Sequence, residues 1–345
     1  MSNKSNFKTS FQNPSKDKWY EMVDKVLKGK PFEDEMIENS IDGIEIQALS
    51  IEASGNANDK SSSLQKKTGI WDIRQSIENP KPIEANKEII ADLMGGSTSI
   101  HLKLNMGGIS GRRGIKIKCQ DDMIILLNNI YLQHIKVSVE AGSDFPDATA
   151  NLISAFTEKG SESKNTNICI NADPIAALAQ YGKLPNGLDV TLGEMGSLSK
   201  HMSDEWANVK VVGVDTRVYN LAGSTALQDV GFSLATGIQY LRILEKIGLS
   251  IEEAADQISF LISVDCDTFK TISKLRALRE VWGRCLKTCG VEKPQMHIHA
   301  ETAERMLTKR EPWNNILRTT TAGLAAAIGG ADSISILPFT QTLGG

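Results

Sequence analysis

From residue 69 onward, short apolar runs alternate with longer amphipathic stretches, and this alternation limits the folds that the chain can adopt. Each apolar run but the last is followed by a helical stretch, which is typical of parallel strands joined by helical crossovers. The expected strands are Ile70–Ile77, Ser99–Leu104, Ile135–Val139, Asn167–Asn171, Val209–Val214, Ile258–Val264, Gln295–His299 and Ser333–Leu337.

Eight such units can close into a barrel of about 250 residues. We therefore predict an α/β fold over residues 69–345, a (β/α)8 barrel. A doubly wound open sheet is the alternative, because alternation alone does not establish closure. The sequence ends six residues after Phe339, where an eighth helix would begin. We expect that helix to be missing, through truncation or because a partner supplies the cover.

Residues 1–68 differ from the rest and form a predicted N-terminal extension. A polar tail is expected to be poorly ordered. The spacing of Trp19 to Leu27 then predicts a short helix that Gly29 and Pro31 end. A brief strand at Ile44–Ile46 and a polar linker at Ala53–Lys67 complete the extension. A short amphipathic helix on a polar tether has little surface of its own to pack against, so we expect this extension to contact a partner subunit.

Charge and composition exclude several classes of partner. The 38 basic and 42 acidic residues give a net charge of −4, which argues against nucleic acid as the main partner. The one basic cluster, Arg112, Arg113, Lys116 and Lys118, is expected to be a solvated loop and strand edge. No apolar run approaches the length of a membrane span. Five cysteines without a C-x-x-C pair, and no leader-like N-terminus, favour a cytoplasmic protein.

In a barrel, function resides where the strands end and the following loops begin. Ionisable residues gather there, including Glu140, Asp173 and Asp215. They predict a polar pocket without specifying a reaction. His297 and His299 are two apart and would share one face of a strand. No third metal ligand stands at a suitable spacing, so we expect His297 to be buried and His299 to contact a ligand.

Several enzyme classes lack their signatures. The sequence contains no G-x-S-x-G, no P-loop and no G-x-G-x-x-G opening a helix. An aldolase-like barrel would need a Schiff-base lysine or a metal cluster at the strand ends. Lys210 lies at the start of a strand and Lys274 on a helix, so neither fits.

From about residue 15 to the end, the sequence resembles the methylmalonyl-CoA mutase family. The N-terminal pattern Trp19…Gly29…Phe32…Asp42-Gly43-Ile44 is similar to the opening of that family's small subunit. The further motifs that carry the resemblance are Trp71–Gln75, Tyr219–Ser224 with Gln228, Leu234–Gly237, Lys274–Ala277 with Trp282, His299–Thr302, Asn314–Thr319 and Gly329–Ala331.

The resemblance implies a (β/α)8 barrel through which the pantetheine arm of coenzyme A threads. It also implies a separate C-terminal domain that binds cobalamin through D-x-H-x-x-G, and a radical interconversion of methylmalonyl-CoA and succinyl-CoA in propionate metabolism. In such chemistry the cofactor supplies the radical and the protein positions it. The D-x-H-x-x-G motif is missing, so we expect adenosylcobalamin in the holoenzyme and none bound by this chain alone.

The chain departs from the family's catalytic chains at four positions. Ser76 replaces a tyrosine, Asn220 follows Tyr219 where the histidine of a Tyr-His pair would stand, Glu301 replaces a glutamine and Gln257 an arginine. A serine is too short to shield a radical pair as a tyrosine does. A carboxylate at position 301 would oppose an anionic substrate. We therefore expect no catalytic and no metal-binding residue in this chain.

Other positions match residues that line the acyl-CoA channel in the family. These are Arg74, Ser259 and His299, and with Tyr219, Asn220 and Glu301 they form the predicted substrate-binding set. The favoured interpretation is a small-subunit barrel that forms a heterodimer with a catalytic large subunit and stabilises it, with acyl-CoA binding possible. The alternative is an acyl-CoA isomerase chain of altered specificity that uses a separately supplied cobalamin domain.

Overall fold

The computed structural model describes residues 15–49, 69–107, 113–160, 166–206 and 208–344. The chain divides into two compact units, Met1–Lys60 and Ser61–Gly345, and the division falls within the undescribed residues 50–68. The predicted polar tail and the predicted linker Ala53–Lys67 lie outside the described residues.

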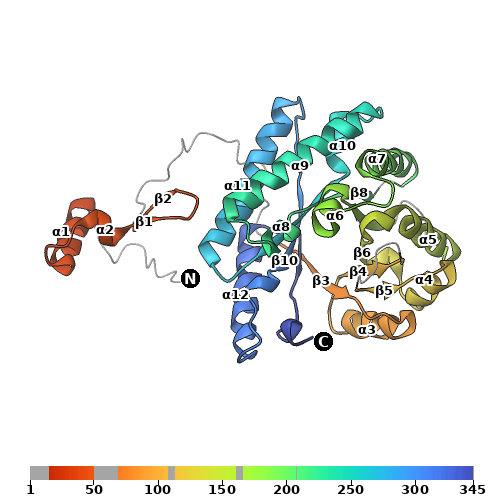
Figure 1. Cartoon of the computed structure of the whole chain (residues 1–345), viewed down its shortest axis with the longest axis horizontal. Helices are drawn as coiled ribbons and strands as arrows, with labels where there is room; N and C mark the ends of the chain where they lie inside the picture. The colour runs from red at the N-terminus through yellow and green to blue at the C-terminus, as the bar shows by residue number, and fades with distance from the viewer. Residues whose placement is uncertain (1–14, 50–68, 108–112, 161–165, 207, 345) are drawn as a thin grey trace, which may run out of the picture. The chain divides into compact units, whose positions relative to one another are not determined.

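The second unit is a closed barrel of eight parallel strands, which confirms the predicted fold (Figure 1). The sheet is ordered β3-β11-β10-β9-β8-β7-β6-β4, and β3 also pairs with β4, so the barrel has no free edge. The strands are β3 (Asp72–Ile77), β4 (Ser99–Asn105), β6 (Lys136–Glu140), β7 (Asn167–Ala172), β8 (Val209–Asp215), β9 (Ile258–Val264), β10 (His297–Thr302) and β11 (Ser333–Ser335). The two-residue strand β5 (Ile115–Lys116), which pairs in parallel with the end of β4, was not predicted.

Helices surround the strands and follow the predicted alternation. Their bounds are α3 (Pro82–Met94), α4 (Gln120–Leu126), α5 (Phe145–Glu158), α6 (Pro174–Tyr181), α7 (Leu188–Glu205), α8 (Arg217–Leu221), α9 (Ala226–Lys246), α10 (Ile251–Asp256), α11 (Thr268–Thr288) and α12 (Asn314–Gly329). Short 3-10 turns lie at η3 (Leu132–His134), η4 (Gly142–Asp144), η6 (Glu304–Met306) and η7 (Gln341–Leu343). No described helix is long and apolar enough to cross a membrane.

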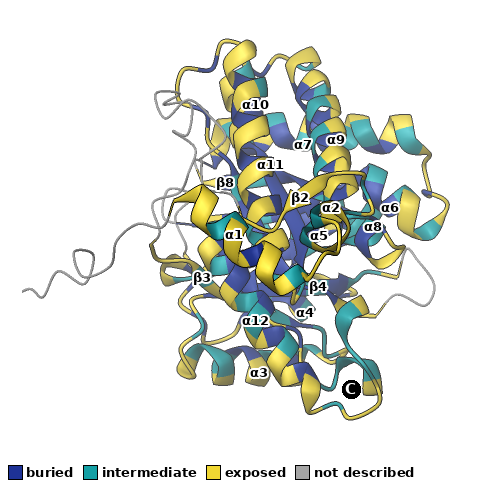
Figure 2. Ribbon diagram, turned by 90° about the vertical axis from the view of Figure 1, so that its left-hand side faces the viewer, coloured by how far each residue is buried: buried dark blue, intermediate teal, exposed yellow. Residues whose placement is uncertain are grey.

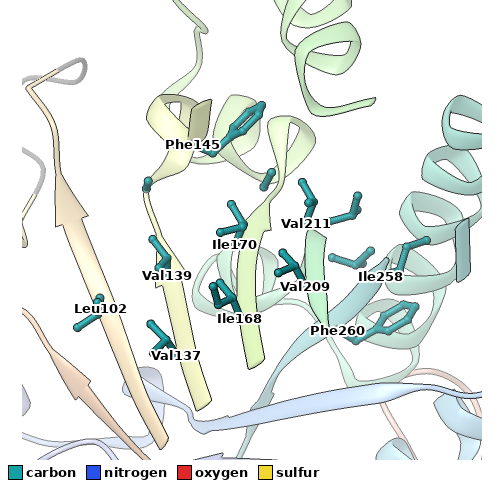
Figure 3. Close-up of a cluster of buried hydrophobic side chains, with 14 of the residues drawn as sticks. Leu102, Val137, Val139, Phe145, Ile168, Ile170, Val209, Val211, Ile258 and Phe260 are labelled. Carbon is teal, nitrogen blue, oxygen red and sulfur yellow. The ribbon is translucent and has the colours of Figure 1, made fainter. Parts of the chain in front are cut away.

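The two faces of the barrel strands have opposite character. Alternate side chains such as Val137, Val139, Ile168 and Ile170 belong to the hydrophobic cluster between strands and helices (Figure 3). The intervening positions are largely polar, as in the series Ser99, His101 and Lys103 of β4, and by alternation they face the barrel axis. Most barrels fill that axis with branched apolar side chains. Here the axis is polar, which makes it a candidate for function.

Close packing explains two of the motifs noted in the sequence. A Cβ added to Gly237 of α9 would lie 2.9 Å from the ring of Trp282 on α11. The indole of Trp282 also meets Phe260 of β9 edge-to-face at 4.9 Å between ring centroids. Only glycine therefore allows α9 to pack this closely over the indole.

The outer surface is exposed while the barrel strands are buried (Figure 2). Beyond β11, the structure describes the short turn η7 and no further helix. Ile73 of β3 is accordingly 51% exposed, Leu324 of α12 57% and Ile336 42%. The described residues thus leave one section of the barrel wall uncovered.

The first unit contains α1 (Lys16–Leu27), α2 (Phe32–Met36) and a two-stranded antiparallel sheet of β1 (Ile37–Asn39) and β2 (Glu45–Gln47). The predicted helix and brief strand are both present, and the Ser15 hydroxyl caps α1 by accepting a hydrogen bond from Lys18 N–H. Among the described residues of this unit, Val23 is the one that is buried. So small a core gives this unit little independent stability.

Candidate functional site

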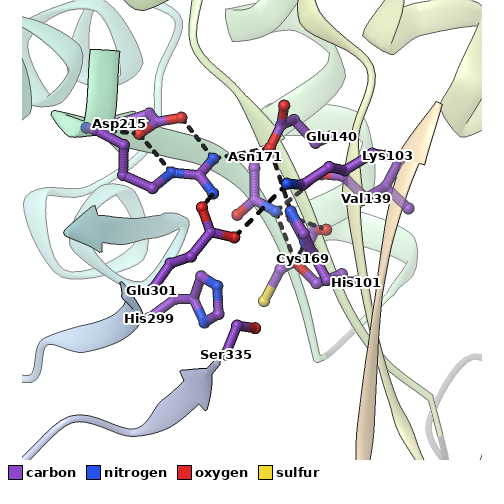
Figure 4. A network of polar contacts seen from close by, with 12 residues as sticks. His101, Lys103, Val139, Glu140, Cys169, Asn171, Asp215, His299, Glu301 and Ser335 are labelled. Carbon is purple, nitrogen blue, oxygen red and sulfur yellow. Dashed lines mark hydrogen bonds and ion pairs between the residues drawn. The ribbon is translucent and has the colours of Figure 1, made fainter. Parts of the chain in front are cut away.

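Arg217 is the centre of a charged network at the carboxyl end of the barrel. Its guanidinium donates from Nη1 to Glu301 (2.9 Å), from Nη2 to Glu140 (2.8 Å) and from Nε and Nη2 to Asp215 (2.9 and 2.7 Å). Arg217 thus joins the ends of three strands, β6, β8 and β10. Lys103 of β4 joins the network through Glu301, since its Nζ lies 3.8 Å from Glu301 Oε2 (Figure 4).

Local geometry sets the position of Arg217. Asp215 ends β8, and its carboxylate accepts a hydrogen bond from Arg217 N–H at 3.0 Å, which fixes the first turn of α8. The side chain then extends across the mouth toward the ends of β6 and β10. Because every guanidinium nitrogen already donates to a carboxylate, Arg217 has little capacity left for a ligand.

Mutual attraction keeps this network ionised. Burial alone would lower the pKa of Arg217, but the three surrounding carboxylates raise it well above its usual range. Burial would raise the pKa of Glu301, whereas Arg217 and Lys103 lower it. The same arginine, with His101 and Lys103, holds the pKa of Glu140 well below normal against the effect of burial. Two basic side chains, Arg217 and Lys103, thus face three carboxylates, and the network as a whole carries one negative charge.

A second polar layer lies deeper in the barrel. His101 forms a hydrogen bond with the Ser138 hydroxyl through Nδ1 (2.9 Å) and with the Glu140 carboxylate through Nε2 (3.2 Å). The centroid of its ring lies 5.5 Å from that of His299. His299 Nδ1 contacts Ser333 at 2.9 Å, while its Nε2 has no partner among the described residues. Burial, reinforced by Arg74 and His101, lowers the pKa of His299 well below normal. Burial also lowers the pKa of His101, against the opposing effect of Glu140, so burial favours the neutral form of both rings.

Two further predicted residues lie in this interior and are engaged by the protein. Ser259, 1% exposed, donates to Asn171 at 3.0 Å. Arg74, 2% exposed, donates from Nε to Ser99 at 2.9 Å, and its Nη2 has no hydrogen-bond partner among the described residues. Burial is the main cause that lowers the pKa of Arg74.

A cavity of about 450 Å³ opens above the Arg217 network. Tyr219, Asn220 and Glu301 of the predicted set line it, together with Lys103, Arg305 and Leu337. Arg74, Ser259 and His299 do not line it, because they lie below the network in the barrel interior. The structure thus divides the predicted set into three residues at the mouth and three inside the barrel.

The side chain of Asn220 is held by protein atoms behind the mouth. Its amide donates to Asp229 at 3.1 Å, and Asp229 also accepts hydrogen bonds from Ser224 and from Lys274 (2.9 Å). Arg305 Nη1 donates to the carbonyl oxygens of Asn220 (2.8 Å) and Ser224 (3.0 Å). Asn220 is 3% exposed, so it contributes to the fold of α8 more than to the cavity.

The positions of His299 and Glu301 differ from the sequence expectation. The strand predicted at Gln295–His299 instead runs from His297 to Thr302, so His299 lies in mid-strand and not at its end. Glu301 does not present a free carboxylate, because Arg217 and Lys103 neutralise it. The described residues include no group of three or more His, Cys, Asp or Glu side chains that could hold a metal ion.

Sequence reasoning did not place Arg217 or Lys103 in the site. Arg217 comes two residues after Asp215, and a basic side chain next to an acidic strand end was the available signal. Lys103 continues the alternation of Ser99 and His101 on β4, which indicates an inward direction. Neither signal shows that one guanidinium would join three carboxylates from distant parts of the sequence.

Comparison with known proteins gives a consistent result. The profile of the methylmalonyl-CoA mutase family matches residues 62–344. The methylmalonyl-CoA mutase small subunit of Streptomyces virginiae is 33% identical over 80% of this chain and 43% of its own length. The small subunit from Propionibacterium freudenreichii subsp. shermanii is 32% identical to this chain, and the methylmalonyl-CoA mutase of Escherichia coli strain K12 is 26% identical. Each of these two matches covers 79% of this chain and 41% of the relative's own length. This chain therefore spans a little over two fifths of the relatives it matches.

Proposed function

This chain belongs to the methylmalonyl-CoA mutase family, and from that premise we propose that it is the barrel of a small subunit which does not itself catalyse the isomerisation. In this proposal it forms a heterodimer with a catalytic large subunit and stabilises that subunit. The isomerisation of methylmalonyl-CoA to succinyl-CoA then takes place in the large subunit.

The observation that carries the proposal is the complete engagement of Arg217. A mutase that acts on methylmalonyl-CoA must accept a negatively charged acyl group at the mouth of its barrel. Here Glu140, Asp215 and Glu301 surround the arginine at hydrogen-bonding distance. An incoming carboxylate would have to displace one of them, and the three carboxylates with Arg217 and Lys103 carry a net charge of −1. The mouth thus disfavours the substrate that the family's reaction requires.

Two further positions support the same proposal. Asn220 stands where the resemblance places a histidine in catalytic chains, and its amide is directed to Asp229. Ser76 stands where those chains have a tyrosine, and it does not line the cavity. Neither side chain can shield a radical or donate a proton to a thioester at the mouth.

Two observations support the assignment of adenosylcobalamin to the partner. The sequence lacks D-x-H-x-x-G, and the side chains that line the described cavity include no histidine that could ligate cobalt. We therefore assign adenosylcobalamin to the catalytic partner and derive no step through it in this chain. Acyl-CoA isomerisation by this chain with a separately supplied cobalamin domain remains the competing function.

The test combines this chain with a longer mutase chain from the same organism that carries the Tyr-His pair and D-x-H-x-x-G. We expect the two to co-elute on size exclusion, and we expect this chain alone with adenosylcobalamin to leave methylmalonyl-CoA unchanged. In the assembled enzyme, Glu301→Gln in this chain should change kcat by less than about twofold. Turnover by this chain alone, or failure of the two chains to associate, would contradict the proposal.

A further inference from the structure

A second cavity lies away from the Arg217 network, also at the carboxyl end of the barrel. It has a volume of about 360 Å³, and it lies between the loop that leads from β3 into α3 and the segment from β5 to α4. Its lining residues are Pro80, Lys81, Pro82, Ile83, Glu84, Lys116, Lys118 and Asp122. None of these residues lines the cavity at the mouth.

The backbone fixes the two walls of this groove relative to one another. Lys116 N–H donates to Pro80 O at 3.2 Å, which joins the β5 segment to the loop before α3. On the β5 wall, Ile115 and Ile117 are 0% and 1% exposed, whereas the alternating Lys116 and Lys118 are exposed. Extended alternation therefore places both lysines on the same side of their segment. Lys81 belongs to the opposite wall.

The charges in the groove are unbalanced. Of the described carboxylates, none forms an ion pair with Lys81, Lys116 or Lys118. Two carboxylates also line the groove: Glu84 pairs with Lys87 at 3.0 Å, and Asp122 accepts a hydrogen bond from the backbone N–H of Lys118 at 2.8 Å. Three ammonium groups without an ion pair to a described carboxylate thus line the groove with two carboxylates, an excess of one positive charge in a chain whose net charge is −4. Their mutual repulsion is relieved when an anion binds between them.

The groove also has an apolar side. Ile83 is 58% exposed, and Pro80 and Pro82 flank it. A ligand that satisfies both features carries clustered negative charge at one end and an apolar or aromatic group at the other. A cavity of this size falls within the range that holds small molecules.

We propose that the groove between Lys81, Lys116 and Lys118 binds a phosphate-bearing small molecule of the nucleotide class. The phosphates lie among the three ammonium groups, and the base lies over Pro80, Pro82 and Ile83. Lysine provides strong point charges for such phosphates without fixing one geometry. This site is independent of the mutase-type function proposed for the barrel mouth.

Calorimetric titration of the full chain with ATP, tripolyphosphate and adenosine tests the proposal at low ionic strength. We expect ATP to bind more tightly than tripolyphosphate, and adenosine to give no detectable heat. Binding should weaken by about tenfold or more between about 50 and 200 mM salt, because the contacts are ionic and exposed. Absence of binding by both ATP and tripolyphosphate to folded protein would overturn the proposal.

Variants separate this groove from general surface charge. Lys116→Gln/Lys118→Gln should weaken ATP binding by about tenfold, as expected for the loss of two direct phosphate contacts. Lys183→Gln/Lys293→Gln makes the same charge change at exposed sites outside the groove and should leave binding unchanged. Ile83→Ser should remove the advantage of ATP over tripolyphosphate. Equal weakening by both double variants, or binding of a glutamate-rich peptide as tight as that of tripolyphosphate, would overturn the assignment.

Discussion

Arg217 Nη1 donates a 2.9 Å hydrogen bond to Glu301 Oε1, which joins the turn after β8 to the end of β10. The side chains of both residues are 11% exposed, so this charged pair is largely removed from solvent. Glu301 is therefore part of a built network and does not present a free carboxylate. Arg217 is thereby held with every guanidinium nitrogen donating to a carboxylate, which leaves it little capacity for a further anion.

Loss of Arg217 should destabilise the barrel. Arg217→Gln leaves Glu140, Asp215 and Glu301 close together with Lys103 as the remaining nearby cation, and we expect the free energy of unfolding to fall by about 2–4 kcal/mol. Glu301→Gln removes one charged contact and should cost less, about 1–2 kcal/mol. Urea denaturation of both variants measures this difference. A destabilisation by Glu301→Gln as large as that by Arg217→Gln would show that the arginine is not the centre of the network.

The barrel and the approximate positions of its eight strands could be predicted from the sequence because short apolar runs alternate with longer amphipathic stretches. Even Ile258–Val264, which is buried throughout, was recognised from its apolar run. The exact ends of β10 could not be predicted, because they are set by its pairing with Ser259–Val264 of β9, which the sequence alone does not show.

The contacts within the site could not be predicted either, because they also depend on how distant segments pair. Arg217 and Glu301 are 84 residues apart, and only closure of the barrel brings them together.

The buried pair of Asp229 and Lys274 should be essential for the fold of α8. The side chain of Asp229 is 1% exposed and that of Lys274 is 4% exposed, and Lys274 Nζ lies 2.9 Å from Asp229 Oδ2. Asp229→Asn leaves a buried ammonium without its carboxylate and should cost about 3–5 kcal/mol. A double-mutant cycle with Lys274→Met measures the coupling, and we expect the double variant to lose much less than the sum of the single losses. Additive losses would contradict a direct interaction.

Acid should destabilise the barrel through histidines whose pKa is lowered in the folded state. Burial lowers the pKa of His297 to about 3, so in the pH range between this value and its ordinary pKa the unfolded chain binds a proton that the folded chain does not. The contribution to stability is therefore present above the unfolded pKa and is lost as the pH falls toward 3. Denaturation from about pH 7 to about pH 4 should show falling stability, with a smaller slope in His297→Gln. His201→Gln, at an exposed helix position, is the matched control for the loss of a histidine.

Arg74 should be replaceable by an apolar residue of similar length. No described carboxylate forms an ion pair with its buried guanidinium, and its Nη2 has no hydrogen-bond partner there. Arg74→Met removes a buried charge that has no ion pair with a described carboxylate, and it should leave the thermal midpoint unchanged or raise it. Arg74→Ala leaves a cavity and should cost about 2–5 kcal/mol. A large loss of stability in Arg74→Met would show that the guanidinium has a partner essential to the barrel.

The most direct test of the account is calorimetric titration of the folded chain with methylmalonyl-CoA and succinyl-CoA in the absence of adenosylcobalamin. The carboxylates that surround Arg217 predict no detectable binding of either compound. Glu301→Gln, which frees one guanidinium contact at the mouth, serves as the matched comparison and should bind more tightly than the wild type. Micromolar binding of methylmalonyl-CoA by the unaltered chain would contradict the non-catalytic assignment and favour an acyl-CoA isomerase.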